Sequence, residues 1–231
     1  MNTIGIVGGL GPESTIEYYR MLIASFQRRT GEKNLPPILI NSIDVYRGLA
    51  LVEAGQLAEL ADYVADAIRS LADAGADFAI ISANTPHLVF SEVQARSPIP
   101  LLSIVEAACA AVQQQGIMRA ALLGTRFTMQ ARFYPEVFSR AGLALLIPNG
   151  DEVAFIHDKY VNELLQGTFL PETRAGLLEI IARMHRDDHV EGVILAGTEL
   201  PLILTGDSAA GIPLFDTTRI HVEAAVASLL S

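Results

Sequence analysis

Residues 3–15 read TIGIVGGLGPEST, and this stretch decides the fold class. Its first five residues are an apolar run that predicts a buried strand, and the glycines and proline of residues 8–12 end that strand. A helix is expected to begin at Glu13 or Ser14 and to run to about Arg29, because apolar residues recur there at helical spacing. A strand that turns directly into an amphipathic helix is the opening of an α/β protein.

The same alternation continues along the chain. Short apolar runs predict further strands at residues 37–40, 77–81, 119–123, 143–147 and 192–195. Helices are expected between them, at residues 57–74, 105–115, 129–141, 151–165, 172–186 and 218–230. The strand at residues 77–81 has a continuous apolar run after Asp77, which is typical of a parallel strand covered on both faces. The order therefore predicts an α/β fold with parallel sheets flanked by helices.

A weak internal repeat indicates two lobes. Residues 4–9 resemble residues 120–125, and residues 78–85 resemble residues 192–199, at nearly the same offset. A common offset favours duplication over the chance recurrence of short apolar runs. We expect two pseudo-symmetric lobes, the first formed by residues 1–98 with 211–231 and the second by residues 99–210, with an active-site cleft between them.

The composition limits the class of protein. Hydrophobic residues make up 51% and charged residues 18%, so the chain can bury a sizeable core. The net charge of -10, without a cluster of basic residues, argues against a nucleic-acid partner. The sequence has one cysteine, Cys109, so an intrachain disulfide is impossible and a thiolate zinc site is not expected. No signal-peptide pattern or membrane-length apolar run is present, which predicts a cytoplasmic protein without membrane contact.

Ligands of parallel sheets bind at the carboxyl ends of the strands. Four such ends are candidates here, at residues 8–15, 83–87, 124–128 and 197–199. The first loop could hold an anion on its backbone N–H groups or be a tight turn that needs glycine. The other ends carry amides and hydroxyls that suit a small polar ligand, although each alone could cap a helix. The candidate binding residues are Gly9, Leu10, Gly11, Asn84, Thr85, Thr125, Thr128 and Thr198.

Two titratable residues at these ends are catalytic candidates. His87 could transfer protons or hydrogen-bond a helix start, and Glu199 could act as a base, bind an amine or bond to the backbone. His185 and His189 have a spacing that could suit a metal, but they lie in a polar helix end and are expected to be solvated. Cys109 lies among alanines and is expected in the core. No metal site is predicted.

These segments resemble the cofactor-independent aspartate/glutamate racemase family over essentially the whole chain. The resemblance rests on residues 8–15, 83–87, 122–125, 197–199 and 215–217. It implies two similar lobes around a cleft, no cofactor, an amino-acid or dicarboxylate ligand, and a homodimer. It also implies a carboxylate-binding arginine in the loop that holds Arg47. A lysine that some members carry before the glycine matching Gly167 is missing here.

In this family, two cysteines face each other across the substrate and exchange its α-proton on opposite faces. The corresponding residues here are Ala83 and Gly197, and neither can exchange a proton. Cys109 falls in the helix after the first lobe and cannot stand in for either. Three readings remain open: a protein that binds its ligand without racemising it, an enzyme of different chemistry (decarboxylation, elimination or isomerisation), or a cysteine-substituted variant of an active racemase. The retained polar residues favour ligand binding over racemisation.

Overall fold

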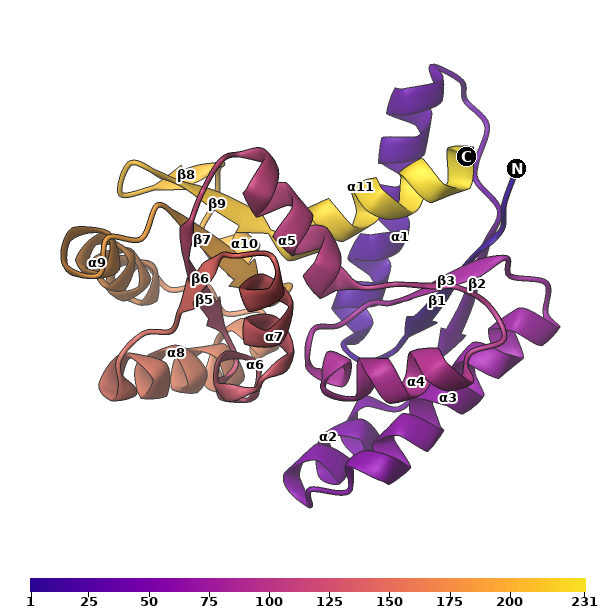
Figure 1. Ribbon diagram of the computed structural model, residues 1–231, viewed down its shortest axis with the longest axis horizontal. Coiled ribbons are helices and arrows are strands. Elements are labelled where there is room, and N and C mark those ends of the chain that lie inside the picture. The colour runs from indigo at the N-terminus through magenta and orange to yellow at the C-terminus, as the bar shows by residue number, and fades with distance from the viewer. The chain divides into compact units, whose positions relative to one another are not determined.

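Two separate parallel sheets form the framework of the protein, in a computed structural model that describes all 231 residues. Unit 1 comprises Met1–Ala107 with Thr218–Ser231, and unit 2 comprises Ala108–Thr217. The α/β class is as predicted. Each unit is described by itself below (Figure 1).

Unit 1 has a four-stranded parallel sheet in the order β2-β1-β3-β4. The strands are β1 (Ile4–Gly8), β2 (Ile38–Ser42), β3 (Phe78–Ile81) and β4 (Leu101–Leu102). Its helices are α1 (Pro12–Thr30), α2 (Val45–Glu53), α3 (Leu57–Asp73), the short η1 (Thr85–Val89), α4 (Phe90–Arg96) and α11 (Thr217–Leu230). The sequence predicted α1, α3 and α11, and it missed the short helices α2 and α4.

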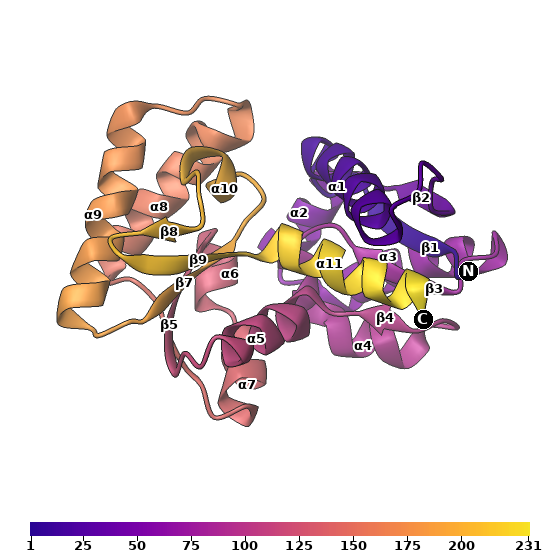
Figure 2. The same ribbon diagram turned by 90° about the horizontal axis from the view of Figure 1, so that it is seen from above.

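Alternating side chains of the unit 1 strands build two cores. Ile4 and Ile6 of β1 pack with Tyr18 and Phe26 of α1 and with the apolar face of α11. Val7, on the opposite face of the sheet, packs against α3 and α4. Figures 1 and 2 show α1 and α11 side by side over one face of this sheet. The two-residue period of a strand therefore covers both faces with helices, as predicted.

Unit 2 has a five-stranded sheet in the order β6-β5-β7-β9-β8. The strands are β5 (Arg119–Gly124), β6 (Ala144–Leu146), β7 (Gly192–Ala196), β8 (Ser208–Ala209) and β9 (Ile212–Asp216), and only β8 runs antiparallel. The helices are α5 (Ile104–Gln114), α6 (Arg126–Gln130), α7 (Phe133–Arg140), α8 (Gly150–Asn162), η2 (Leu164–Gln166), α9 (Pro171–Asp187) and α10 (Leu200–Ile203). Figure 2 shows α8 and α9 on one side of the sheet, and α5 and α7 on the other.

The strand orders agree with the duplication inferred from sequence. The order β2-β1-β3-β4 in unit 1 corresponds to β6-β5-β7-β9 in unit 2, with the repeated segments on β1 and β5 and on β3 and β7. The observed boundaries differ from the expected ones, because β4 pairs with β3 and so lies in unit 1, whereas β9 pairs with β7 and so lies in unit 2.

One expected helix is divided into two. Residues 129–141 were predicted as a single helix, but α6 ends at Gln130 and α7 begins at Phe133. Ala131 lies between them with the extended backbone angles φ -76° and ψ 163°, which interrupt the helical hydrogen-bond ladder.

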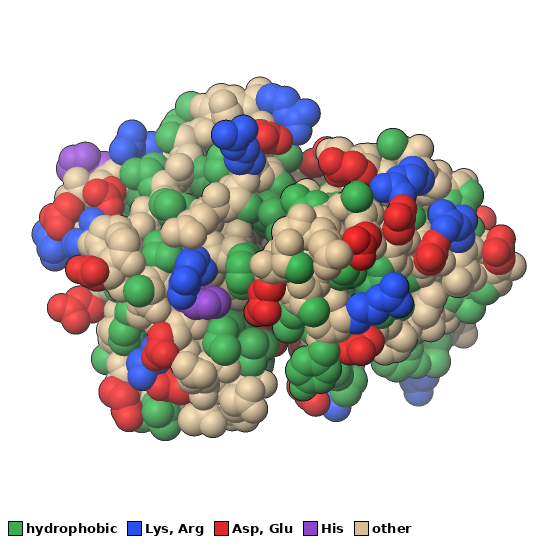
Figure 3. Space-filling model, turned by 90° about the horizontal axis from the view of Figure 1, so that it is seen from below, with side chains coloured by type: hydrophobic (Ala, Val, Ile, Leu, Met, Phe, Trp, Pro, Cys, Tyr) green, Lys and Arg blue, Asp and Glu red, His purple; other side chains and the backbone are tan.

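Basic and acidic side chains are interspersed over the face drawn in Figure 3, without a continuous basic patch. None of the helices combines the length and the apolar character needed to cross a membrane.

Candidate functional site

The candidate residues flank one structurally equivalent position in each unit. In the order β2-β1-β3-β4, the chain leaves β1 toward one side and returns on the other, so the loops after β1 and β3 diverge. Such switch points are where open α/β sheets bind ligands. Residues 8–15 follow β1 and residues 83–87 follow β3, while residues 124–128 follow β5 and residues 197–199 follow β7. The predicted residues thus lie at the strand ends of both units, in one cluster in each.

The loop after β1 is a turn closed by its own hydrogen bonds. Gly9 has a positive φ of 77°, and a side chain there would overlap the carbonyl oxygen of Ile43. Its backbone N–H donates to Thr15 Oγ1 at 2.9 Å and is therefore already used. The Ser14 hydroxyl donates to the Ser82 carbonyl oxygen at 2.7 Å, which ties this loop to the end of β3. Of the two readings of the loop, the tight turn has the direct structural support.

The end of β3 carries no reactive side chain at position 83. Ala83 is half-buried and lines a small apolar cavity of about 60 Å³ together with Leu10, Gly48, Leu60, Thr85 and other residues of α2 and the loops. Asn84 beside it is buried, and Thr85 begins η1. Open apolar space therefore lies beside Ala83 at this strand end.

His87 has the surroundings of a structural residue. Its Nε2 accepts the backbone N–H of Ile104 at 3.3 Å, and its Nδ1 lies 3.0 Å from the Ala83 carbonyl oxygen, which fixes a neutral ring that donates from Nδ1. Burial, reinforced by nearby His221, lowers the pKa of His87 to about 3. Because both nitrogens bond to the backbone, the geometry favours the structural role over proton transfer.

His221 of α11 completes this buried pair. Its Nε2 lies 3.0 Å from the Leu102 carbonyl oxygen, and its Nδ1 lies 3.0 Å from the Tyr18 hydroxyl. Burial lowers the pKa of His221 to about 4. The two neutral histidines therefore join α11, β4 and the end of β3 inside unit 1.

Arg47 is exposed on α2, and its guanidinium lies 4.3 Å from the centre of the Tyr63 ring. It forms no ion pair with a carboxylate. The helix begins at Asp44, whose side chain caps it by accepting the backbone N–H of Tyr46 at 2.8 Å. A cation held on an aromatic ring without a carboxylate partner remains able to bind an anionic ligand group.

The two threonines after β5 are occupied with capping. Thr125 caps α6, since its hydroxyl accepts the backbone N–H of Thr128 at 3.3 Å, and the two hydroxyls lie 3.2 Å apart. Thr128 is buried, whereas Thr125 is partly exposed. This local role was the alternative considered from the sequence, and it leaves the exposed side of Thr125 for a ligand.

At the end of β7, a tyrosine occupies the space beside Gly197. A Cβ atom placed on Gly197 would lie 2.5 Å from the hydroxyl oxygen of Tyr160 and 2.6 Å from its ring. Real Cβ atoms do not approach so closely, and Tyr160 is only 4% exposed. Glycine at position 197 and the phenol of α8 are thus structurally coupled.

The Tyr160 hydroxyl donates a hydrogen bond to Glu199 Oε2, and the Thr198 hydroxyl donates to the same oxygen at 2.8 Å. Burial and the neighbouring carboxylate raise the pKa of Tyr160 well above its usual value of 10.0, so the proton stays on the phenol. The arrangement is a carboxylate held by two hydroxyl donors at the strand end. Tyr160 was missed in the sequence because it lies in a helix remote from every strand-end motif, and only its helical spacing as a core residue was visible.

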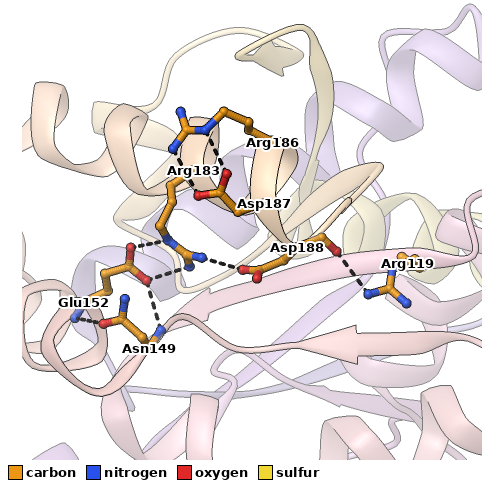
Figure 4. A network of polar contacts seen from close by, with 7 residues as sticks. All are labelled: Arg119, Asn149, Glu152, Arg183, Arg186, Asp187 and Asp188. Carbon is orange, nitrogen blue, oxygen red and sulfur yellow. Dashed lines mark hydrogen bonds and ion pairs between the residues drawn. The ribbon is translucent and has the colours of Figure 1, made fainter.

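A charged network holds α8, the helix that carries Tyr160, against α9 (Figure 4). Arg183 of α9 donates to both carboxylate oxygens of Glu152 at 2.6 and 2.7 Å and to Asp188 at 2.6 Å. Glu152 also forms a capping box with Asn149 at the start of α8. A two-pronged arginine–carboxylate bond is geometrically specific, so it fixes the start of the helix that presents the phenol.

The remaining residues considered from the sequence are His185, His189 and Cys109. His185 and His189 are exposed, and no group of three or more His, Cys, Asp or Glu side chains is arranged to hold a metal ion. Cys109 is buried in α5.

The chain is similar to proteins of one known family over nearly its whole length. The model of the Asp/Glu/Hydantoin racemase family matches residues 7–225. The broad specificity amino-acid racemase RacX of Bacillus subtilis (strain 168) is 26% identical over 239 residues, which cover 99% of this chain and 98% of that protein. A Yersinia pestis protein described as a candidate Asp/Glu racemase is 31% identical, with a TM-score of 0.93 over 100% of both chains. An aspartate racemase homologue from Pyrococcus horikoshii OT3 is also 31% identical, with a TM-score of 0.87 over 100% of both chains. This chain belongs to the Asp/Glu/Hydantoin racemase family.

Proposed function

We propose that the protein binds a small amino acid or dicarboxylate through the strand-end groups of its two units, and that it does not racemise this ligand by the two-thiol route. The observation that carries the proposal is at Gly197, where the Tyr160 phenol occupies the space next to the strand in which a cysteine would begin. Position 197 is therefore packed against the Tyr160 side chain. The predicted cleft between the lobes, the homodimer, the absence of a cofactor and the cytoplasmic location stay predictions.

The chemistry of inversion supports the negative half of this proposal. Moving an α-proton from one face of a carbon to the other needs a group on each face that can both lose and accept a proton. Ala83 has a methyl group, and Gly197 has no side chain. The nearby phenol holds its proton more firmly than a free tyrosine, because burial raises its pKa. A buried phenol is thus a poor substitute for a thiol, whose ordinary pKa lies nearer neutrality.

The retained polar groups support the binding half. Arg47 lacks a carboxylate partner and suits a ligand carboxylate, as the family resemblance implies for that loop. Thr125, Thr198 and Asn84 supply hydroxyl and amide groups at the ends of the parallel strands. Family relatives include a broad specificity amino-acid racemase, which favours an amino acid as the ligand class.

The same contact argues against a simple ligand-trapping variant of an active racemase. Replacing one cysteine by glycine would leave an empty site, but the space at position 197 is filled by Tyr160. Tyr160 in turn bonds to Glu199, so three residues form one packed arrangement.

A second candidate function is an enzyme whose chemistry needs only one face of the substrate. The carboxylate of Glu199 favours it, because the hydroxyls of Tyr160 and Thr198 hold one carboxylate oxygen at a strand end, where the group could take a proton from one face of a substrate. Decarboxylation, elimination or isomerisation would need such a group on one side only.

A ligand screen separates these functions. Purified protein is mixed with each enantiomer of the common amino acids and with small dicarboxylates, and binding is followed by thermal shift and calorimetry. The proposal expects saturable binding of at least one compound with no new product after long incubation. Conversion of the bound compound would support the one-face enzyme instead. A complete lack of binding across the panel would contradict both.

A further inference from the structure

Glu199 is a nearly buried carboxylate without a cationic partner. Glu199 is only 9% exposed, and it takes part in no ion pair. Glutamate is rarely buried to this extent unless a positive group compensates its charge. No positive group of the protein therefore balances the negative charge of Glu199 at the end of β7.

The two oxygens of this carboxylate differ. Oε2 accepts hydrogen bonds from the hydroxyls of Tyr160 and Thr198. Oε1 has no hydrogen-bond partner, and it is not among the atoms sealed from solvent without one. The two donors hold one oxygen in place and leave the other available at a strand end, where ligands of parallel sheets bind.

We infer that Glu199 Oε1 binds the ammonium group of the ligand, and that Tyr160 and Thr198 are positioning residues that hold the carboxylate for it. An ammonium supplies both the missing positive charge and an N–H donor. A neutral hydroxyl would supply only the donor, and a metal ion would need further ligands that the protein does not gather here. The inference rests on the proposed ligand binding and narrows it from dicarboxylates in general to compounds with an amino group.

This role differs from that of a racemase thiol. Tyr160 takes the space of the missing side chain at position 197, and through its hydroxyl it orients Glu199. One side chain, that of Tyr160, thus both fills the space beside Gly197 and orients the Glu199 carboxylate. The strand end has exchanged a proton-transfer group for a fixed anionic acceptor.

Matched ligand pairs test the inference in the full-length protein. Calorimetry compares aspartate with succinate and glutamate with glutarate, because members of each pair differ by the amino group. We expect the amino acid of one pair to bind at least about 10-fold more tightly than its amine-free partner, since a charge-assisted bond of about 1.4 kcal/mol gives that ratio. Equal binding of both members of a pair would overturn the inference and leave the proposed function standing. No binding by any of the four would overturn the inference and count against the proposed function.

Variants then locate the preference. Glu199→Gln should remove most of it, weakening the amino acid about 10-fold while changing the amine-free partner less than about 3-fold. Tyr160→Phe keeps the ring and should reduce the ratio by a smaller factor, whereas a purely structural role would weaken both ligands equally. Glu179→Gln makes the same chemical change on an exposed carboxylate of α9 and should leave the ratio unchanged. If Glu199→Gln weakens both members of a pair equally, the carboxylate does not read the amino group.

Discussion

The ends of β3 and β7 occupy equivalent places in the two units, yet Ala83 and Gly197 have different surroundings there. At the end of β3, Ala83 lines an apolar cavity of about 60 Å³. At the end of β7, the Tyr160 phenol fills the space beside Gly197 and bonds to Glu199. A cysteine at position 83 therefore needs one substitution. A cysteine at position 197 also needs a change at Tyr160, because the phenol occupies the space that the new side chain would take.

The two ends also use their titratable residues differently. His87 near β3 has both ring nitrogens bonded to the backbone, and it forms a buried neutral pair with His221. Glu199 after β7 keeps one carboxylate oxygen without a partner. His87 therefore has a structural role in unit 1, whereas Glu199 of unit 2 is the residue that we propose to contact the ligand.

A fall in pH should cause the largest loss of stability, because the two buried neutral histidines both lie in unit 1. The folded pKa values of His87 and His221, about 3 and about 4, lie below the ordinary 6.5, so the unfolded chain binds more protons between those values. Their contribution is complete above pH 6.5 and is lost as pH falls toward 4. Urea unfolding at pH 7 and pH 5 should differ by about 2 kcal/mol for each histidine.

A variant pair isolates that effect from the carboxylates. His221→Gln should be less stable than the parent at pH 7 but should lose less stability on going to pH 5. His185→Gln, on the exposed end of α9, should keep the parent's pH dependence. Equal stability of the parent at pH 7 and pH 5 would show that the two histidines are not buried in neutral form.

Restoring the second thiol alone should destabilise the protein. Gly197→Cys forces the Tyr160 ring from its place and breaks its bond to Glu199, which we expect to lower the unfolding free energy by about 1–3 kcal/mol. Adding Tyr160→Leu opens the space, so the double variant should lose less than the sum of the single changes. A thermal-unfolding cycle measures this coupling, and strict additivity would contradict the contact between positions 160 and 197.

The support for α8 should matter less. Arg183→Ala removes the bonds to Glu152 and Asp188 that hold the start of the helix carrying Tyr160. We expect a loss of about 1–2 kcal/mol, because these bonds are charge-assisted but partly solvated. Arg186→Ala, whose ion pair with Asp187 is largely exposed, should change stability by less than about 0.5 kcal/mol. Chemical denaturation compares the two, and equal effects would remove the special role of Arg183.

Restoring the first thiol should have the smallest effect. Ala83→Cys adds one sulfur atom beside an existing cavity, so the midpoint of thermal unfolding should move by no more than about 2 °C. A loss as large as that of Gly197→Cys would mean that the end of β3 is as closely filled as the end of β7.

Much of the fold could be predicted from the sequence. The strand-to-helix turn at residues 3–15 and the common offset of the repeated segments predicted two parallel sheets, and the structure has them in matching strand orders. The family followed from short motifs at strand ends, which local sequence preserves. The unit boundaries were placed too early, because the pairing of β4 and β9 with distant strands is not visible in local patterns.

The coupling of Gly197 to Tyr160 could not be predicted in this way. The two residues are remote in sequence, and Tyr160 reads as an ordinary core residue of an amphipathic helix. Similarly, the sequence was compatible with either a catalytic or a structural role for His87. Only the partners of its two ring nitrogens favour the structural role. Which of two local roles a side chain adopts depends on tertiary neighbours, and a single sequence does not contain them.

The central claim is that the family framework persists here without two-base proton exchange. Its most direct test is proton NMR of aspartate and of glutamate incubated in D₂O with the purified protein, which follows the α-proton signal of each enantiomer. The account predicts that the signal stays undiminished, at the level of a protein-free control, for both enantiomers of both amino acids. Loss of the α-proton signal catalysed by the protein, above all with appearance of the opposite enantiomer, would contradict it.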